Sequence, residues 1–345
     1  MRAWSVIHPG PLNSSPLVPA ERPKPVPRGS EVLVRVRTCG VCRTDLHLAE
    51  GDLAPRQPSV VPGHEVVGEV VERGPASTRL PLGARVGIAW LRQTCGQCRW
   101  CHSGRENLCQ RSLYTGWDAD GGYAEFALVP EAYAYRIPES FDDVHAAPLL
   151  CAGIIGYRSL RRANLPPAGR LGLYGFGASA HLVAQVALAQ GAEVHVMTRG
   201  ERAQLLAKEL GCTSVSGPNG TPAVPLDSAI IFAPAGELVP VALEALDDGG
   251  SLALAGIHMS DVPTLDYKRH LFRERSLCSV TSNTRRDGEE FLRLAARLGV
   301  RAHTTLYEFE DADQALRHVA EGRGGAAVLR VAGDVRDPTP GTTPT

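Results

Sequence analysis

The amino-acid sequence predicts an α/β protein with two domains, one built on a doubly wound parallel sheet and the other β-rich and barrel-like. Its 345 residues are enough for two ordinary domains. In the first half, glycine and proline interrupt short strand patterns at close intervals, which is typical of a compact β domain. From about residue 149 onward, strand patterns alternate with helical ones, as in a parallel sheet covered by helices.

The charge and hydropathy of the chain limit its partners. The formal net charge is −1, so no basic field favours nucleic acid or an acidic membrane surface. The N-terminus, MRAWSVIHPG, lacks the apolar run of a signal peptide, and no apolar stretch is long enough to span a bilayer. We therefore expect a cytoplasmic protein that binds neither nucleic acid nor membrane.

The β-rich half contains three clear strand patterns. Residues 31–38 (EVLVRVRT) alternate apolar and polar side chains, as a half-buried strand does, and residues 65–74 and 84–90 are similar. In the second half we expect about six parallel strands joined by right-handed crossovers. The predicted strands there are 170–176, 193–198, 228–234, 251–256 and 276–283, and the predicted helices are 178–191, 201–211 and 237–246.

The chain after the predicted sheet is too short to fold alone, so we expect it to return to the first domain. It contains predicted helices at 288–299 and 312–322 with a short strand between them. The Pro- and Thr-rich end is expected to be a disordered tail. The predicted domains are 1–151 with 284–335, then 152–283, with the tail at 336–345.

Four of the nine cysteines lie in one short segment, CGQCRWCHSGRENLC. Such crowding in a reducing compartment indicates a metal site rather than disulfides. Four thiolates fill a tetrahedral zinc site and leave no position for substrate, so this zinc would be structural. An iron–sulfur cluster and unliganded thiols are the alternatives. The predicted zinc ligands are Cys95, Cys98, Cys101 and Cys109.

A glycine-rich loop follows the first strand of the parallel sheet. Gly175, Gly177 and Ala180 fit the pattern G-x-G-x-x-G/A, in which the first glycine makes a tight turn and the second lets the backbone approach a pyrophosphate. The third small residue allows close helix–strand packing, and the helix N-terminus favours the phosphate charge. A tight turn without a nucleotide is the alternative, because the motif alone has many false positives.

Three further segments carry a resemblance to a known family. They are CGVCRTDLH at 39–47, PGHEVVGEVVERG at 62–74 and APLLCAG at 147–153. Together, in this order and spacing, they resemble the zinc-containing alcohol dehydrogenase family of the medium-chain dehydrogenases, over almost the whole chain. The resemblance implies a Rossmann doubly wound parallel sheet plus a GroES-like β-barrel catalytic domain that carries a structural zinc lobe.

The resemblance also implies a second, catalytic zinc, and so two Zn²⁺ per subunit. Its ligands would be Cys42, His64 and Cys151, with the fourth position open to water or substrate oxygen. Glu65 would be a transient fourth ligand or a carboxylate beside the ligands. Cys39 is not expected to be a ligand.

Three residues near these ligands have roles implied by the resemblance. Asp45 would hold the zinc-bound histidine by its second ring nitrogen. Thr44 would hydrogen-bond the substrate oxygen, and His47 would be the outer proton relay, linked through the cofactor ribose. The alternatives are helix capping for Asp45 and Thr44 and a solvated surface histidine for His47.

The end of the second parallel strand distinguishes the two nicotinamide cofactors. NAD enzymes usually carry an acidic residue there for the ribose 2′-hydroxyl, whereas this chain has Thr198 and Arg199. Since Arg199 could bind a 2′-phosphate, NADP is favoured over NAD. Glu201 or a backbone group could still serve NAD.

The resemblance assigns a pyrophosphate contact to Arg43. Related enzymes often carry another phosphate-binding arginine where this chain has Ala326. Cofactor affinity is therefore expected to depend more on Arg43, or on Arg285 or Arg286.

By the same resemblance, Trp90, Trp117 and Leu53 line an apolar pocket, with ordinary core packing as the alternative. The expected substrate is a small primary or secondary alcohol, or the corresponding aldehyde, and the expected assembly is a homotetramer or homodimer. Three other functions stay open: polyol dehydrogenation, a non-catalytic zinc-binding module, and a dehydrogenase fold without activity. The near-neutral charge and the dinucleotide motif oppose the second, and the complete ligand set opposes the third.

Overall fold

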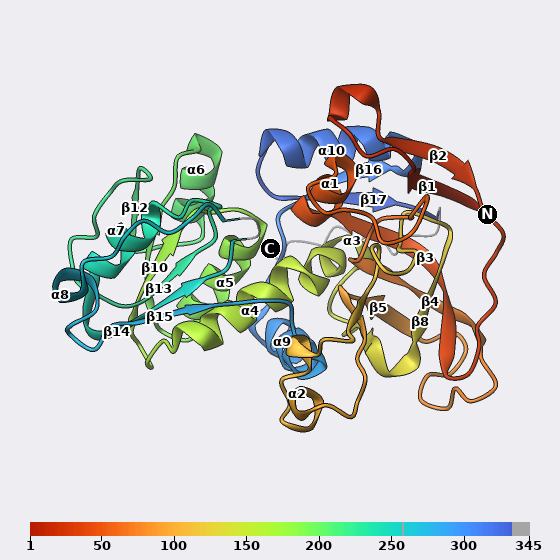
Figure 1. Cartoon of the computed structure of the whole chain (residues 1–345), viewed down its shortest axis with the longest axis horizontal. Coiled ribbons are helices and arrows are strands. Elements are labelled where there is room, and N and C mark those ends of the chain that lie inside the picture. Colours follow the sequence, from red (N-terminus) through yellow and green to blue (C-terminus); the bar gives the residue numbers. More distant parts are fainter. Residues whose placement is uncertain (257–258, 333–345) are drawn as a thin grey trace, which may run out of the picture. The chain divides into compact units, whose positions relative to one another are not determined.

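The chain folds as two units with separate sheets (Figure 1). The computed structural model describes residues 1–256 and 259–332. Of the described residues, the first unit contains Met1–Cys151, Asn283–Ala296 and 302–332, and the second contains those within Ala152–Ser282 and Arg297–Arg301. The expected tail at 336–345 lies outside the described residues.

The first unit is organised around β3 (Glu31–Val41), which is long enough to pair with three other strands. β4 (Val66–Arg73) lies antiparallel along one edge of β3. On its other edge, β3 pairs with β8 (Phe126–Pro130) over its first half and with β17 (Ala326–Arg330) over its last residues. β5 (Arg85–Ile88), β9 (Ala134–Arg136) and β16 (Thr304–Glu308) extend the sheet to the order β16-β17-β3-β4-β5-β9.

The core of the first unit follows from the alternation predicted for β3. Val32, Val34 and Val36 are fully buried, whereas Arg35 between them is exposed. Because β17 comes from the C-terminal segment and pairs with β3, the chain returns to this unit.

The first unit also contains two small two-stranded sheets, several helices and short 3₁₀ turns. The two sheets are β1 (Arg2–Val6) with β2 (Leu17–Glu21) and β6 (Leu91–Gln93) with β7 (Leu113–Tyr114). The helices are α1 (Arg43–Glu50), α2 (Arg99–His102), α3 (Asp143–Ala146), α9 (Arg285–Leu298) and α10 (Ala312–Glu321), and the 3₁₀ turns are η1 (Leu12–Ser14), η2 (Glu106–Leu108), η3 (Glu131–Tyr133), η4 (Ala147–Leu150) and η5 (Phe309–Asp311).

The second unit is a six-stranded parallel sheet in the order β12-β11-β10-β13-β14-β15. The order reverses at β10, so right-handed crossovers put α5 and α6 on one face and α7 on the other. Its strands are β10 (Arg170–Tyr174), β11 (Glu193–Met197), β12 (Ser214–Ser216), β13 (Leu226–Ile231), β14 (Leu246–Leu254) and β15 (Ser276–Ser279), and its helices are α4 (Ala152–Ala163), α5 (Ala178–Ala189), α6 (Glu201–Glu209), α7 (Leu238–Glu244) and α8 (Tyr267–His270).

Two features of the parallel-sheet unit were not predicted. Strand β12 has only three residues, too few to show a periodic pattern. Helix α4 packs against α5 through Gly156, where a Cβ would lie 2.7 Å from Val183 Cγ2. The predicted doubly wound parallel sheet is confirmed.

Helix α9 begins three residues before the predicted start. Its first turn is capped by Thr284 and Asp287: the Thr284 backbone N–H and hydroxyl both donate to the Asp287 carboxylate, and the Thr284 hydroxyl accepts from the Asp287 N–H. Gly288 lies inside the helix because the ring of Tyr135 packs there, 2.4 Å from where a Cβ would be. Within 1–256 and 259–332, no helix has the length and apolarity needed to cross a membrane.

Candidate metal centre and cofactor loop

The candidate metal centre lies in the first unit, where three separate segments meet. Cys42 follows β3, His64 and Glu65 directly precede β4, and Cys151 follows η4. One potential ligand atom from each of these residues lies within 4.8 Å of the others. The structure therefore brings together the three predicted ligands and the predicted neighbouring carboxylate.

Cys42 is held by the start of α1. It is the N-cap of that helix, and its Sγ accepts a hydrogen bond from the Thr44 N–H at 3.3 Å. In return, the Asp45 carboxylate accepts from the Cys42 N–H at 2.9 Å, which completes a capping box. A cysteine thus takes the place that serine or threonine usually holds, and its sulfur is fixed by the helix it begins.

A glycine turn presents His64 to the same point. Gly63 has a φ of +95° and would bring a Cβ within 2.4 Å of the Tyr123 ring, so glycine is required there. The His64 ring is 1% exposed, and its Nε2 lies 3.2 Å from Cys42 Sγ. Its Nδ1 lies 3.5 Å from Asp45 Oδ1, which also accepts from the Gly63 N–H at 3.0 Å. Asp45 is therefore both the predicted helix cap and the predicted neighbour of the histidine.

The electrostatics of the cluster favour a cation. The hydrogen bond from Cys151 and the nearby His64 lower the pKa of the Cys42 thiol to about 5, and the same hydrogen bond raises the pKa of Cys151. Burial alone would lower the pKa of His64, but the Cys42 thiolate and the Asp45 carboxylate raise it well above its usual value. Burial raises the pKa of Glu65. The raised pKa values mean that protons on His64, Glu65 and Cys151 compensate negative charge that a metal ion would compensate instead.

The donor set fits zinc. Two thiol sulfurs and one imidazole nitrogen are the ligand types of a catalytic zinc with a fourth position open. In a tetrahedral site, a sulfur and a nitrogen ligand lie about 3.6 Å apart, close to the separation of Cys42 Sγ and His64 Nε2. Cys39, which was not expected to be a ligand, is fully buried and is not part of this group.

The two predicted proton-transfer residues lie on α1. Thr44 is nine-tenths buried in the first turn of the helix, beside Cys42. His47 is one turn further along, and its Nδ1 lies 2.9 Å from the Asp52 carboxylate. Asp52 was not predicted, and the only sequence signal for it is its position just after the helix.

An aromatic layer lies beside His64. The ring of Trp90 meets the His64 ring edge-on at 4.9 Å and stacks on Tyr114 at 4.9 Å and on Trp117 at 5.9 Å. The Arg56 guanidinium lies 3.7 Å from the centre of the Trp117 ring. Trp90 and Trp117 were predicted as pocket residues, whereas Tyr114 and Arg56 were not. Leu53, the third predicted residue, is half-buried and its N–H donates to the His47 carbonyl.

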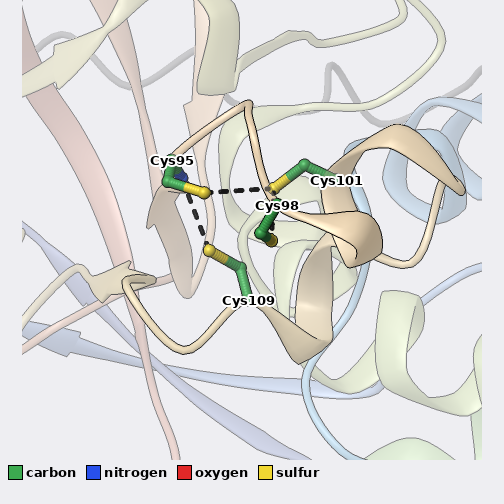
Figure 2. A group of neighbouring side chains, drawn as sticks. All are labelled: Cys95, Cys98, Cys101 and Cys109. Carbon is green, nitrogen blue, oxygen red and sulfur yellow. Dashed lines mark hydrogen bonds between the residues drawn. The ribbon is translucent and has the colours of Figure 1, made fainter.

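The four-cysteine lobe is compact, as Figure 2 shows. Its four sulfurs lie within 4.8 Å of one another, with Cys95–Cys101 at 3.9 Å and Cys98–Cys101 at 3.6 Å. Ligands at a Zn–S distance of about 2.3 Å in a tetrahedron lie about 3.8 Å apart. The arrangement therefore fits a zinc ion bound by four sulfurs.

Arg111 was not predicted as a residue of the four-cysteine lobe. Backbone N–H groups and the Arg111 side chain lower the pKa of Cys95 to about 5, and that thiolate in turn raises the pKa of Arg111. Burial raises the pKa of Cys109 to about 11. The position of Arg111, two residues after the last cysteine, was the only available signal.

The glycine-rich loop joins β10 to α5 in the second unit. Gly175 has a φ of +87°, and its N–H donates to the Met197 carbonyl at the end of β11. No atom lies within 4 Å of the position that a Cβ on Gly177 would take, so the backbone is open to a ligand at that point. Ala180 is fully buried, as the close packing of the motif requires. This is the geometry expected for a bound pyrophosphate.

Thr198 and Arg199 lie at the same edge of the sheet as the glycine loop. Thr198 is buried, its N–H donates to the Ser216 carbonyl, and its own carbonyl accepts from Gln204. Arg199 is exposed in the loop before α6. The backbone that carries Arg199 is thus anchored while its side chain is free to extend.

The other predicted phosphate contacts are all in the first unit. Arg43 is exposed at the start of α1. Arg285 forms a two-pronged ion pair with Glu106, with a shortest distance of 2.7 Å, and Arg286 pairs with Glu290. Since Arg285 and Arg286 already have carboxylate partners, Arg43 is the better candidate. Ala326 is buried at the start of β17.

Comparisons with known proteins identify the family to which the chain belongs. The model of the alcohol dehydrogenase GroES-like domain matches residues 28–139, and the zinc-binding dehydrogenase model matches residues 180–297. The chain belongs to the zinc-type medium-chain dehydrogenase/reductase family. It is 58% identical to a probable alcohol dehydrogenase, AdhA, of Mycobacterium tuberculosis, over 96% of this chain and 97% of that protein.

Two solved structures show the same fold. A cinnamyl alcohol dehydrogenase from Sorghum bicolor is 26% identical with a TM-score of 0.87, over 98% of this chain and 99% of that one. A thermostable alcohol dehydrogenase from Pyrobaculum aerophilum, with cobalt and zinc bound, is 26% identical with a TM-score of 0.87, over 96% and 99% of the two chains. The expected family is confirmed, and the protein is an NAD(P)-dependent alcohol oxidoreductase.

Proposed function

We propose that the protein is a zinc-dependent alcohol dehydrogenase and aldehyde reductase with two zinc ions per subunit and a preference for NADP over NAD. The observation that carries the proposal is the meeting of Cys42, His64, Glu65 and Cys151, from three segments, within 4.8 Å. Four potential ligands from distant parts of a sequence rarely gather in a buried place without a metal to hold. The proposed zinc of the four-cysteine lobe is structural.

In the proposed site, Cys42, His64 and Cys151 would hold the zinc, and the fourth position would be available to the substrate oxygen. Zinc supplies a Lewis acid that polarises a carbonyl group and lowers the pKa of a hydroxyl group. Asp45, whose Oδ1 lies 3.5 Å from His64 Nδ1, would orient the ring so that Nε2 is available to the metal. The Glu65 carboxylate, which lies in the same cluster, is available as an alternative fourth ligand.

The residues of α1 would carry the proton away. The buried Thr44 hydroxyl would accept a hydrogen bond from the substrate hydroxyl, and His47 would pass the proton to solvent. Asp52, 2.9 Å from His47 Nδ1, would keep a proton on that nitrogen, so Nε2 would be the ring nitrogen that accepts one. The histidine suits this last step because its ordinary pKa is near neutral pH.

The cofactor and substrate parts of the proposal depend on fewer residues. The nicotinamide cofactor supplies or accepts the hydride, and the loop at Gly175 and Gly177 would bind its pyrophosphate. The exposed Arg199 supports NADP, because a guanidinium can pair with the 2′-phosphate. The aromatic layer of Trp90, Tyr114 and Trp117 supports aromatic or aliphatic alcohols over polyols. We also propose a homotetramer or homodimer and a cytoplasmic location, which nine free thiols favour.

The proposal is tested by the rate of absorbance change at 340 nm. The zinc-loaded protein is given benzyl alcohol or benzaldehyde with NADP(H) and, separately, with NAD(H). We expect turnover that is faster with NADP(H) and absent in Cys42→Ser. Full activity of Cys42→Ser would contradict the zinc mechanism. Turnover with NAD(H) alone would contradict only the cofactor preference.

A further inference from the structure

The segment that carries Cys151 is joined to the rest of the metal cluster by side-chain contacts. Cys42 follows β3 and His64 precedes β4, and these strands are hydrogen-bonded neighbours in one sheet. Cys151 instead follows α3 and η4, two short helical turns that pack on β3, β4 and β5 without strand pairing. The position of Cys151 relative to the other two ligands therefore depends on how these turns are held.

A buried carboxylate holds the start of this segment. Asp143, the first residue of α3, is 0% exposed. Arg85 of β5 donates through Nε to Asp143 Oδ1 at 2.7 Å, and its Nη2 lies 2.7 Å from the same oxygen. Arg37 Nη1 of β3 lies 3.6 Å from Asp143 Oδ2, and Arg37 Nη2 pairs with Glu69 of β4 at 2.5 Å. We call these four side chains (Asp143, Arg85, Arg37 and Glu69) the Asp143 clamp.

The clamp reaches β3 and β4, which adjoin the other two ligands, and β5, which pairs with β4. A charged carboxylate without exposure is stable only with partners such as these, so removing one partner is costly. The Thr38 hydroxyl of β3 adds a hydrogen bond to the Asp143 carbonyl at 2.8 Å. The start of the segment is therefore tied to the sheet by both its side chain and its backbone.

Close packing holds the other end of the segment. Gly87 of β5 has no side chain where Leu150 lies, and a Cβ there would be 2.6 Å from Leu150 Cδ2. Cys151 is the next residue after Leu150. With both ends of the turns in contact with the sheet, the Cys151 sulfur is placed beside Cys42 and His64.

We propose that the Asp143 clamp positions Cys151 in the metal centre, which makes Asp143 a positioning residue for metal retention. The inference rests on the proposed catalytic zinc site. Without the carboxylate, Arg85 and Arg37 face each other with no anion between them, so the helical turns shift and Cys151 leaves the ligand geometry. Disturbing the groups that orient metal ligands typically weakens metal binding by about 10–100-fold.

The test is the rate of zinc release from the zinc-loaded full chain into a chromogenic chelator. The ion bound at the Cys42 site is identified as the release phase that is missing in Cys42→Ser. In Asp143→Asn we expect this phase to be about tenfold faster or more, with the phase of the four-cysteine lobe unchanged. Asp227→Asn is the matched control, because it removes an aspartate that Arg170 holds at 2.9 Å in the second unit. Its release rates should equal those of the wild type.

A milder variant keeps the test decisive if Asp143→Asn folds poorly. Arg37→Gln removes the 3.6 Å contact to Asp143 and the ion pair with Glu69, but it leaves the Arg85 pair with Asp143 in place. We therefore expect a smaller acceleration of the same phase. Wild-type release from variants with wild-type circular dichroism would overturn the positioning role of the clamp. Absence of a Cys42-dependent zinc in the wild type would instead overturn the proposed zinc site, and the inference with it.

Discussion

Replacing Gly40 by alanine would disturb the metal centre through Glu65. The Glu65 carboxylate fills the space beside Gly40 at the end of β3, where a Cβ would lie 1.8 Å from Oε2, 2.8 Å from Cδ and 2.9 Å from Cβ of Glu65. Because Glu65 is only 2% exposed, its side chain must move against packed neighbours. Overpacking of this kind costs about 1–3 kcal/mol, so we expect Gly40→Ala to lower the free energy of unfolding by about 2 kcal/mol.

A double-mutant cycle followed by urea unfolding tests this reasoning. In the Glu65→Ala background, two of the three close contacts are gone, so Gly40→Ala should cost less by about 1 kcal/mol or more. Gly217→Ala is the control, because no atom lies within 4 Å of the position its Cβ would take. Its unfolding free energy should stay within about 0.5 kcal/mol of the wild type. An equal cost of Gly40→Ala in both backgrounds, or no cost in either, would refute the steric argument.

Three other perturbations have defined outcomes. Arg199→Ala should raise KM for NADPH by about 10–100-fold and leave KM for NADH unchanged, because hydrogen bonds to a charged group contribute about 1.5–3 kcal/mol. Equal effects on both cofactors would contradict the 2′-phosphate contact. Cys98→Ser should remove one zinc per chain and lower the thermal midpoint by about 5 °C or more. An unchanged zinc content would contradict the proposed structural zinc of the four-cysteine lobe. Burial lowers the pKa of His195, so the folded state resists protonation of this histidine, and stability is lost as pH falls below its ordinary pKa of about 6.5. His195→Gln should therefore lose less unfolding free energy than the wild type between pH 7.5 and 5.5 in urea titrations. An identical loss in both proteins would contradict this.

The local patterns in the sequence predicted most of the fold. The strand at 31–38 and the glycine-rich loop at 175–180 are specified by alternation and by backbone requirements that few residues other than glycine meet. The four-cysteine lobe is likewise local, since its ligands span fifteen residues, from Cys95 to Cys109. Short elements such as β12 were missed, because three residues carry no period.

The arrangement around the metal ligands was harder to predict from the sequence, because it depends on contacts between distant segments. The meeting of Cys151 with Cys42 and His64 was expected only from family resemblance. Asp143 was not predicted as a functional residue; it is the first residue of α3 and follows Asp142, which caps that helix. Only the fold brings Arg85, 58 positions earlier, to the Asp143 carboxylate. Burial of a charged group thus depends on partners that spacing cannot reveal.

The proposed function requires two zinc ions in each chain, one bound by four sulfurs and one by two sulfurs and a histidine. X-ray absorption at the zinc edge of the purified, zinc-loaded protein measures both the number of ions and their neighbours. We expect two zinc ions per chain and an average shell of about three sulfur neighbours near 2.3 Å and about one nitrogen or oxygen neighbour near 2.0 Å. In Cys42→Ser, one zinc should remain, with about four sulfur neighbours. An unchanged zinc content and unchanged spectrum in Cys42→Ser would contradict the proposed catalytic zinc site.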